Sequence, residues 1–272
     1  MTVGERGGAS GESRRAVVVI PARFGSTRLP GKPLLAETGK PLIQHVYEQV
    51  RKARGLADVI VATDDERIRA AVEAFGGRAV LTSPAHTCGT DRVAEVARGL
   101  EADIIVNVQG DEPELPPADV EGLVRLLAGE GEAPMATLAY PSADLEVYRS
   151  PDVVKVVVDG RGYALYFSRS PVPFYRDARS GPARFLKHLG VYAYRREFLL
   201  TLTGLAPTPL EQAEKLEQLR ALEHGYRIRV GLASRDSLGI DTPEEYRTFV
   251  TRTVAGARHG AGAAGVRKTG GD

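Results

Sequence analysis

The residues best suited to chemistry in this sequence lie in one cation-rich loop near its start. Arg23, Arg28 and Lys32 supply three positive charges, and Ser26 adds a hydroxyl. Gly31 loosens the backbone, so that its N–H groups can close on phosphate oxygens while the cations neutralise them. The loop therefore predicts a phosphate-binding site. The bland alternative is a basic surface turn that follows a core strand.

The segments on either side of the loop indicate how it is held. Residues 17–20 form an apolar, mostly β-branched run, which is typical of a strand buried on both faces. Pro41 opens a helix, so the loop ends near a partly positive helix N-terminus. The loop departs from Walker A, because Gly25 and Gly31 are one residue too far apart and Lys32 is followed by proline. No G-x-G-x-x-G follows the strand either.

Two aspartates stand where acidic side chains could meet a bound phosphate. Asp111 follows the predicted strand over 103–108, and Asp241 comes just before a helix. Ligands of parallel sheets sit at the carboxyl ends of the strands, so Gln109 and Asp111 should face the pocket of the phosphate loop. Mg²⁺ takes one or two carboxylates together with phosphate oxygens. A magnesium site is one interpretation of the pair, and turn or helix-cap roles are the other.

The stretch Ile-Pro-Ala-Arg-Phe-Gly-Ser-Thr-Arg-Leu-Pro-Gly-Lys-Pro-Leu at residues 20–34 resembles the signature of the sugar-acid cytidylyltransferases, and specifically the CMP-Kdo synthetase family. Kdo is 3-deoxy-manno-octulosonate. The similarity extends over roughly residues 17–250. It implies transfer of CMP from CTP to the anomeric hydroxyl of Kdo, with release of pyrophosphate. It also implies a Mg²⁺ cofactor, a small acidic acceptor as the partner of CTP, and a homodimer.

The resemblance assigns roles to individual residues of the nucleotide site. The motif at residues 84–92 is similar to the family's cytosine-reading loop, where glycine allows backbone to approach the base edge. The implied catalytic residues are Arg23, Lys32, Asp111 and Asp241, the last two also being the implied metal ligands. The implied CTP-binding residues are Arg23, Ser26, Arg28, Lys32, Thr63, Gly89, Arg92 and Gly110. Taken by itself, the 84–92 segment could equally be a loop and helix cap, with Cys88 an inert small residue.

The resemblance also implies an acceptor site, made of residues that lie far apart in the sequence. These residues are Gln109, Arg169, His188, Tyr192, Glu217 and Gln218. His188 and Tyr192 are four apart, which places them on one face of a strand. From the residues alone, His188 is more often a structural hydrogen-bonding group, and the helical run 210–220 could be an amphipathic helix with solvated charges.

Three alternatives remain beside this interpretation. The acceptor could be a phosphonate, such as phosphonoformate, or another sugar acid. The chain could instead be a nucleotide-binding regulator without turnover, although the presence of Lys32 and Asp111 argues against that. The sequence departs from the family pattern at Cys88, where a polar residue is common, and in a short turn over 237–241.

Composition limits the class of protein. The 272 residues carry 36 basic and 35 acidic side chains, a net charge of +1, whereas a nucleic-acid-binding protein normally has a clear basic surplus. A single cysteine fits a reducing compartment. No apolar run reaches the ~20 residues of a membrane span, and the first residues do not look like a secretory signal. We expect a soluble cytoplasmic protein that binds neither nucleic acid nor membrane.

The order of the predicted elements indicates an α/β fold. Strands and helices alternate up to residue 108, which predicts a doubly wound, mostly parallel nucleotide-binding sheet. Residues 135–194 contain strand-like runs without intervening helices, and the region 135–200 is expected to form an antiparallel lid or dimerisation extension beside that sheet. Residues 209–224 are expected to form one helix. The predicted domain covers 16–254, between a disordered N-terminus over 1–15 and a disordered tail over 255–272.

Overall fold

A computed structural model describes residues 14–26, 28–129, 131–177, 184–237 and 239–264, of which 256–264 are described by their backbone alone. The strands are β1 Ala16–Ala22, β2 Leu56–Thr63, β3 Arg78–Leu81, β4 Ile104–Asn107, β5 Met135–Ser142, β6 Lys155–Val158, β7 Ala164–Ser168, β8 Phe185–Arg195 and β9 Ile228–Leu232. The helices are η1 Lys32–Leu34, α1 Leu42–Val50, α2 Glu66–Ala74, α3 Gly89–Arg98, α4 Pro117–Ala128, α5 Leu145–Arg149, α6 Arg196–Leu202, α7 Pro209–Glu214, α8 Gln218–Glu223 and α9 Pro243–Ala264.

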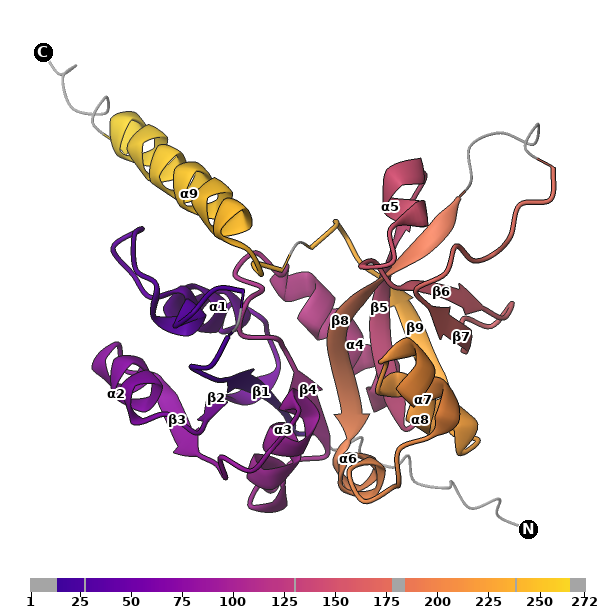
Figure 1. Cartoon of the computed structure of the whole chain (residues 1–272). Helices are drawn as coiled ribbons and strands as arrows, with labels where there is room; N and C mark the ends of the chain where they lie inside the picture. The colour runs from indigo at the N-terminus through magenta and orange to yellow at the C-terminus, as the bar shows by residue number, and fades with distance from the viewer. Residues whose placement is uncertain (1–13, 27, 130, 178–183, 238, 265–272) are drawn as a thin grey trace, which may run out of the picture.

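One sheet runs through the molecule in the order β3-β2-β1-β4-β8-β5-β9 (Figure 1). The strands β3, β2, β1 and β4 are parallel neighbours, and β5 is parallel to β9. Strand β8 is antiparallel to β4 and to β5, between which it lies. The predicted α/β fold with a mostly parallel sheet is confirmed. The antiparallel part, however, is built into the sheet through β8, with only the β6–β7 hairpin off its main path.

Side-chain alternation along β1 explains why helices cover both faces of the sheet. Val18 and Ile20 belong to one core with α1, α2 and α4, whereas Val17 and Val19 belong to a second core with α3, α6 and α8. A strand buried on both faces is apolar throughout, as the run 17–20 predicts. The carboxyl ends of β1 and β4 lead directly into residues 23 and 108–111. These two strand ends carry the candidate site.

The predicted helix over 209–224 is wrong, because it breaks into α7 and α8. Lys215 adopts the left-handed conformation, with φ 55°, and its N–H donates to the carbonyl of Glu211. This is a common way for a helix to end. A buried ion pair then fixes the angle between the two short helices, since Arg220 Nη2 lies 2.5 Å from Glu211 Oε1. Residues 215–217 therefore form a loop rather than the middle of a helix.

Three other boundaries differ from the predictions. Helix α5 interrupts residues 135–194, for which the sequence predicts strands without intervening helices. Arg14 and Arg15 contact the fold, through hydrogen bonds to the carbonyl of Leu127 and the carboxylate of Asp103. Helix α9 runs to Ala264 within the predicted C-terminal tail, a segment rich in alanine, the strongest helix former. Residues 1–13 and 265–272 of the two predicted disordered ends lie outside the described residues.

Candidate active site

The phosphate loop folds around the Phe24 side chain. The N–H groups of Ser26 and Gly31 both donate to the Phe24 carbonyl oxygen, at 2.9 and 3.3 Å. The guanidinium of Arg67, from α2, lies over the Phe24 ring at 3.4 Å from its centroid. Gly31 has a φ of 65°, and a Cβ there would meet the Phe24 ring at 3.3 Å. The turn into Lys32 therefore needs glycine.

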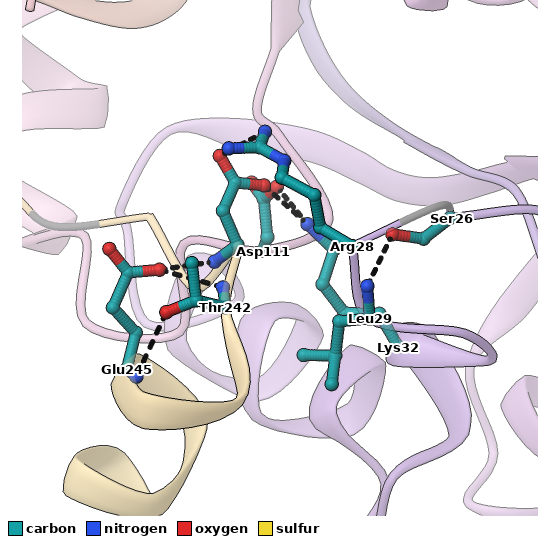
Figure 2. A network of polar contacts seen from close by, with 8 residues as sticks. Ser26, Arg28, Leu29, Lys32, Asp111, Thr242 and Glu245 are labelled. Atoms are coloured by element: carbon teal, nitrogen blue, oxygen red, sulfur yellow. Dashed lines mark hydrogen bonds and ion pairs between the residues drawn. The ribbon is translucent and has the colours of Figure 1, made fainter. Parts of the chain in front are cut away.

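Lys32 lies between two carboxylates from distant loops. Its Nζ is 2.5 Å from Asp111 Oδ2 and 3.0 Å from Asp241 Oδ1, and Arg28 Nη2 is 2.9 Å from Asp241 Oδ2 (Figure 2). Burial acts to raise the pKa of Asp241, but the hydrogen bonds and charges of Lys32 and Arg28 outweigh it and lower that pKa. The predicted phosphate-binding residues and the predicted metal pair thus form one network of charges.

A capping box holds Asp241 at the start of α9. Glu245 Oε2 accepts the N–H groups of Asp241 and Thr242, at 2.7 and 2.8 Å, and Glu245 N–H donates to Thr242 Oγ1 (Figure 2). The N–H of Ile240 donates to the carbonyl of Asp111 at 2.9 Å. This backbone bond joins the two aspartate loops, so the short turn over 237–241 presents Asp241 next to Asp111.

The donor set of the aspartate pair fits magnesium. The two carboxylates converge on one point, the Nζ of Lys32, and offer hard oxygen ligands. Within the described ranges, no group of three or more His, Cys, Asp or Glu side chains could hold a metal ion. Mg²⁺ commonly takes one or two carboxylates and completes its coordination with substrate phosphates and water. A closed zinc site would need more protein ligands than these.

A cavity of about 410 Å³ opens above the phosphate loop, a volume usual for ligand sites. The predicted CTP-binding residues that line it are Arg23, Ser26, Arg28, Lys32, Gly89, Arg92 and Gly110. Two glycines are needed here for close packing: a Cβ on Gly110 would lie 3.0 Å from the Pro21 carbonyl oxygen, and one on Gly89 would lie 3.3 Å from Pro21 Cγ. The segment 84–92 and the 109–111 loop therefore both pack against the end of β1.

Thr63 is the predicted CTP-binding residue that the structure keeps away from the cavity. It is fully buried at the end of β2, and its Oγ1 accepts the N–H of Asp65 at 3.2 Å. This bond shapes the turn into α2, which is a structural role. Arg92 is also buried, with hydrogen bonds to Asp64 and to Thr82, although it does border the cavity.

Cys88 caps α3, its Sγ accepting the N–H of Asp91 at 3.4 Å. Burial, followed by the negative charge of Glu217, raises the pKa of Cys88 to about 12. The thiol is therefore protonated at neutral pH. It is unreactive in that form, because only the thiolate is a nucleophile. This agrees with the prediction of an inert small residue.

A second cavity, of about 860 Å³, opens beside the first. All the predicted acceptor-binding residues line it: Gln109, Arg169, His188, Tyr192, Glu217 and Gln218. The wall is made by β8, by the beginning of the loop that follows β4, and by the loop between α7 and α8. Residues separated by more than a hundred positions are thus brought to one space.

His188 and Tyr192 do share one face of β8, as predicted. Strand β5 pairs Thr137 with Tyr192 but the next residue with Leu189, so two residues of β8 between them have no partner on β5. Because the number of extra residues is even, side chains before and after them keep the same alternation between the two faces. The two rings lie 5.5 Å apart. His188 Nε2 is 3.0 Å from Thr137 Oγ1, and burial lowers the pKa of His188 to about 3. The imidazole is therefore neutral, a hydrogen-bonding group in the cavity wall.

Arg169 is held by backbone carbonyls on two sides. Its Nε donates to the carbonyl of Glu214 at 2.8 Å, and its Nη1 donates to the carbonyl of Pro151 at 3.0 Å. The Glu214 carboxylate accepts the Arg169 N–H and the Ser168 hydroxyl. Nη2 makes no hydrogen bond to any described residue, and so remains available on a guanidinium whose plane is already fixed.

Sequence reasoning missed Thr90, Glu112, Lys187 and Ser237, which also line the second cavity. Burial, followed by the charge of Asp111, raises the pKa of Glu112 to about 7, and Ser237 Oγ lies 3.2 Å from its Oε2. Lys187 pairs with Asp236 at 2.7 Å. Thr90 and Ser237 belong to segments considered above, and Glu112 and Lys187 are the sequence neighbours of Asp111 and His188, which was the available signal.

The two cavities meet at a small shared set of residues. Arg28, Gly89, Gln109, Asp111 and Asp241 border both. The aspartate pair therefore stands at the boundary between the two spaces, so that groups bound on either side would meet there.

Comparison with known proteins identifies the family. Residues 17–228 match the cytidylyltransferase family model. A 3-deoxy-manno-octulosonate cytidylyltransferase from Syntrophobacter fumaroxidans is 56% identical over 87% of this chain and 96% of its own length. An 8-amino-3,8-dideoxy-manno-octulosonate cytidylyltransferase from Shewanella sp. W3-18-1 is 48% identical over 88% of this chain and 99% of its own.

A solved structure is similar over the whole fold. The structure of CMP:2-keto-3-deoxy-manno-octonic acid synthetase complexed with CTP has a TM-score of 0.84 and 49% identity, covering 89% of this chain and 99% of that one. The resemblance drawn from residues 20–34 is confirmed. The chain belongs to the cytidylyltransferase family.

Proposed function

We propose that the protein transfers CMP from CTP to the anomeric hydroxyl of 3-deoxy-manno-octulosonate, with release of pyrophosphate. The observation that carries this proposal is the junction of the two cavities at Asp111 and Asp241. One cavity is lined by three cations suited to a triphosphate, and the other by hydrogen-bonding groups suited to a sugar acid. A reaction between the two substrates needs both to meet at one place.

The chain's own residues position the reactants. Arg23, Arg28 and Lys32 hold the triphosphate and neutralise its charge, while the acceptor hydroxyl approaches the α-phosphorus in line with the departing pyrophosphate. Asp111 and Asp241 would hold Mg²⁺. When bound, this ion polarises the phosphate and helps the acceptor hydroxyl to lose its proton. His188 is neutral and held by Thr137, so it serves to hydrogen-bond the acceptor rather than to carry charge.

The acceptor side supports a polyhydroxylated monocarboxylate. Arg169 Nη2 offers a fixed cationic donor for a carboxylate. Glu217 accepts hydrogen bonds from hydroxyls, and His188, Tyr192 and Gln218 share bonds with others. A phosphonate dianion would be repelled by Glu217. Relatives named for 3-deoxy-manno-octulosonate at 51–56% identity favour this acid.

One relative gives a specific second candidate acceptor. The Shewanella enzyme, at 48% identity, is named for the 8-amino sugar acid, which keeps the carboxylate and replaces one hydroxyl by an amine. The test is an acceptor screen with CTP and Mg²⁺, in which pyrophosphate release is measured for Kdo, its 8-amino analogue and phosphonoformate. We expect the highest kcat/KM for Kdo. A higher kcat/KM for the 8-amino analogue would make that acid the acceptor. If no acid gave pyrophosphate release, the protein would be a non-catalytic nucleotide-binding regulator.

We also propose a homodimer that works in the cytoplasm. The support for the dimer is a pair of exposed apolar side chains in the antiparallel part of the molecule, Leu165 at 62% and Phe174 at 84% exposure. In the described part of the chain, no helix is both long and apolar enough to cross a membrane. Sedimentation equilibrium of the full chain tests the oligomeric state, and a monomer at micromolar concentration would contradict it.

A further inference from the structure

A hydrogen bond from Thr90 connects the start of α3 with the acceptor loop. Thr90, in the first turn of α3, donates its hydroxyl to Glu217 Oε2 at 2.7 Å across 127 positions of sequence. Its neighbour Gly89 borders both cavities, while Thr90 borders the second. The bond therefore lies where the nucleotide-side segment 84–92 touches the acceptor side.

The backbone of Glu217 is held independently of this bond. Lys215 ends α7 in the left-handed conformation, and Leu216 is buried, with its N–H donating to the carbonyl of Glu211 at 3.2 Å. The ion pair between Glu211 on α7 and Arg220 on α8 holds these two helices together. The main chain at Glu217 is thus fixed from the α7–α8 side, but its side chain still has free torsions.

We propose that Thr90 is a positioning residue for the acceptor, because its hydroxyl fixes the Glu217 carboxylate within the second cavity. The bond engages Oε2 of a carboxylate whose residue borders the second cavity. A carboxylate held in this way loses less freedom when the acceptor binds, and so binds it more tightly. This inference rests on the proposed function, in which Glu217 contacts the acceptor.

Steady-state kinetics of the full-length chain with CTP, Kdo and Mg²⁺ test the proposal. Thr90→Val and Thr90→Ala both remove the hydroxyl, and each should raise the KM for Kdo roughly tenfold, the effect of losing one hydrogen bond to a charged group. The Kd for CTP, measured by calorimetry, should stay within about twofold of the wild-type value. Thr90→Ser keeps the hydroxyl and should restore the KM for Kdo, which a merely structural role would not require.

A double-mutant cycle separates this inference from the proposed function. Thr90→Val should add little to the KM for Kdo in a Glu217→Ala background, which lacks any acceptor for the Thr90 hydroxyl. If Glu217→Gln raises that KM but neither Thr90→Val nor Thr90→Ala does, Thr90 is not a positioning residue and the proposed function stands. If Glu217→Gln leaves the KM unchanged, the proposed acceptor role of Glu217 fails and the inference about Thr90 falls with it.

Discussion

The phosphate side and the acceptor side of the candidate site are built in different ways. On the phosphate side, charged ends of side chains from three loops meet, and Lys32 and Asp241 neutralise one another. On the acceptor side, the side chains are held one by one by hydrogen bonds within the protein: His188 by Thr137, Arg169 by two backbone carbonyls, and Glu217 by Thr90. On the phosphate side, the cations must leave their carboxylate partners before they can bind the substrate. On the acceptor side, the side chains already have their positions before the substrate binds.

This difference implies different responses to substitution. A substitution on the phosphate side changes the net charge around the triphosphate. It therefore changes the stabilisation of the negative charge that develops in the transition state. A change on the acceptor side removes one directional contact and acts mainly on substrate affinity. The predictions below test that contrast, from the largest expected effect to the smallest.

Asp111→Asn should give the largest loss. It keeps the size of the side chain but removes a negative charge from the proposed metal site. We expect a decrease in kcat of at least ~10²-fold, equivalent to about 3 kcal/mol of transition-state stabilisation. Pyrophosphate release at saturating Mg²⁺ measures this. Asp58→Asn, which lines neither cavity and pairs with Arg78, is the matched control. A near-normal kcat for Asp111→Asn would exclude Asp111 as a metal ligand.

Glu217→Gln should act on the other side of the site. The neutral amide accepts weaker hydrogen bonds from sugar hydroxyls, so Kdo should bind less well by roughly 1–3 kcal/mol. CTP affinity should be almost unchanged, because the triphosphate is held at the other cavity. Separate KM values for the two substrates show the split, and Glu223→Gln on α8 serves as control. Improved use of Kdo would contradict the acceptor assignment.

Arg23→Lys should have a smaller effect, because the charge remains. Among the described residues Arg23 has no ion pair, and it lines the first cavity, so its planar donors are available to a phosphate. Loss of that fork should weaken CTP binding by about 1 kcal/mol, or several-fold. Calorimetric titration with CTP measures the change, with Arg69→Lys on α2 as control. An unchanged titration would mean that Arg23 does not bind the triphosphate and is an ordinary surface residue.

The smallest effect concerns pH and the neutral His188 in the wall of the second cavity. Because burial lowers the pKa of His188 from 6.5 to about 3, the unfolded chain takes up a proton below pH 6.5 that the folded chain does not. The stability contributed by neutral His188 is therefore present above pH 6.5 and is lost as the pH falls toward 3. The slope is at most about 1.4 kcal/mol per pH unit.

Urea unfolding between pH 4.5 and 8 measures this contribution as a difference between wild type and His188→Gln. Glu112 acts in the opposite direction over part of this range, since its raised pKa favours the folded state at lower pH. Subtracting the two proteins removes that common term. If the difference in unfolding free energy does not change with pH, His188 is not a buried neutral group.

The parts of the site that sequence predicted are those set by local pattern. Residues 17–34 contain a buried strand and a glycine turn, each readable from neighbouring residue types, and Asp111 follows a strand end. Thr63 also lies at a strand end, but its short side chain accepts the N–H of Asp65 instead of facing the cavity. Strand ends predict which edge a residue occupies, but not whether its side chain reaches the ligand.

The parts that sequence reasoning missed depend on contacts between distant residues. The helical pattern over 209–224 continues without a glycine or proline at the break. The break follows from the pairing of Glu211 with Arg220 and from burial of Leu216, which only the folded chain shows. Thr90 is similar, because its partner Glu217 lies in another part of the sequence.

The position of β8 has a consequence for how the chain reaches its fold. This strand bridges β4 and β5, pairing Ile104 with Arg195 and Met135 with Tyr194. Pairings between such distant residues slow folding, because long loops must close before any contact is gained. During synthesis, β4 has no neighbour on that side until residues 185–195 have emerged. Until then its unpaired edge is open to association with other chains, so this step is the most vulnerable to aggregation.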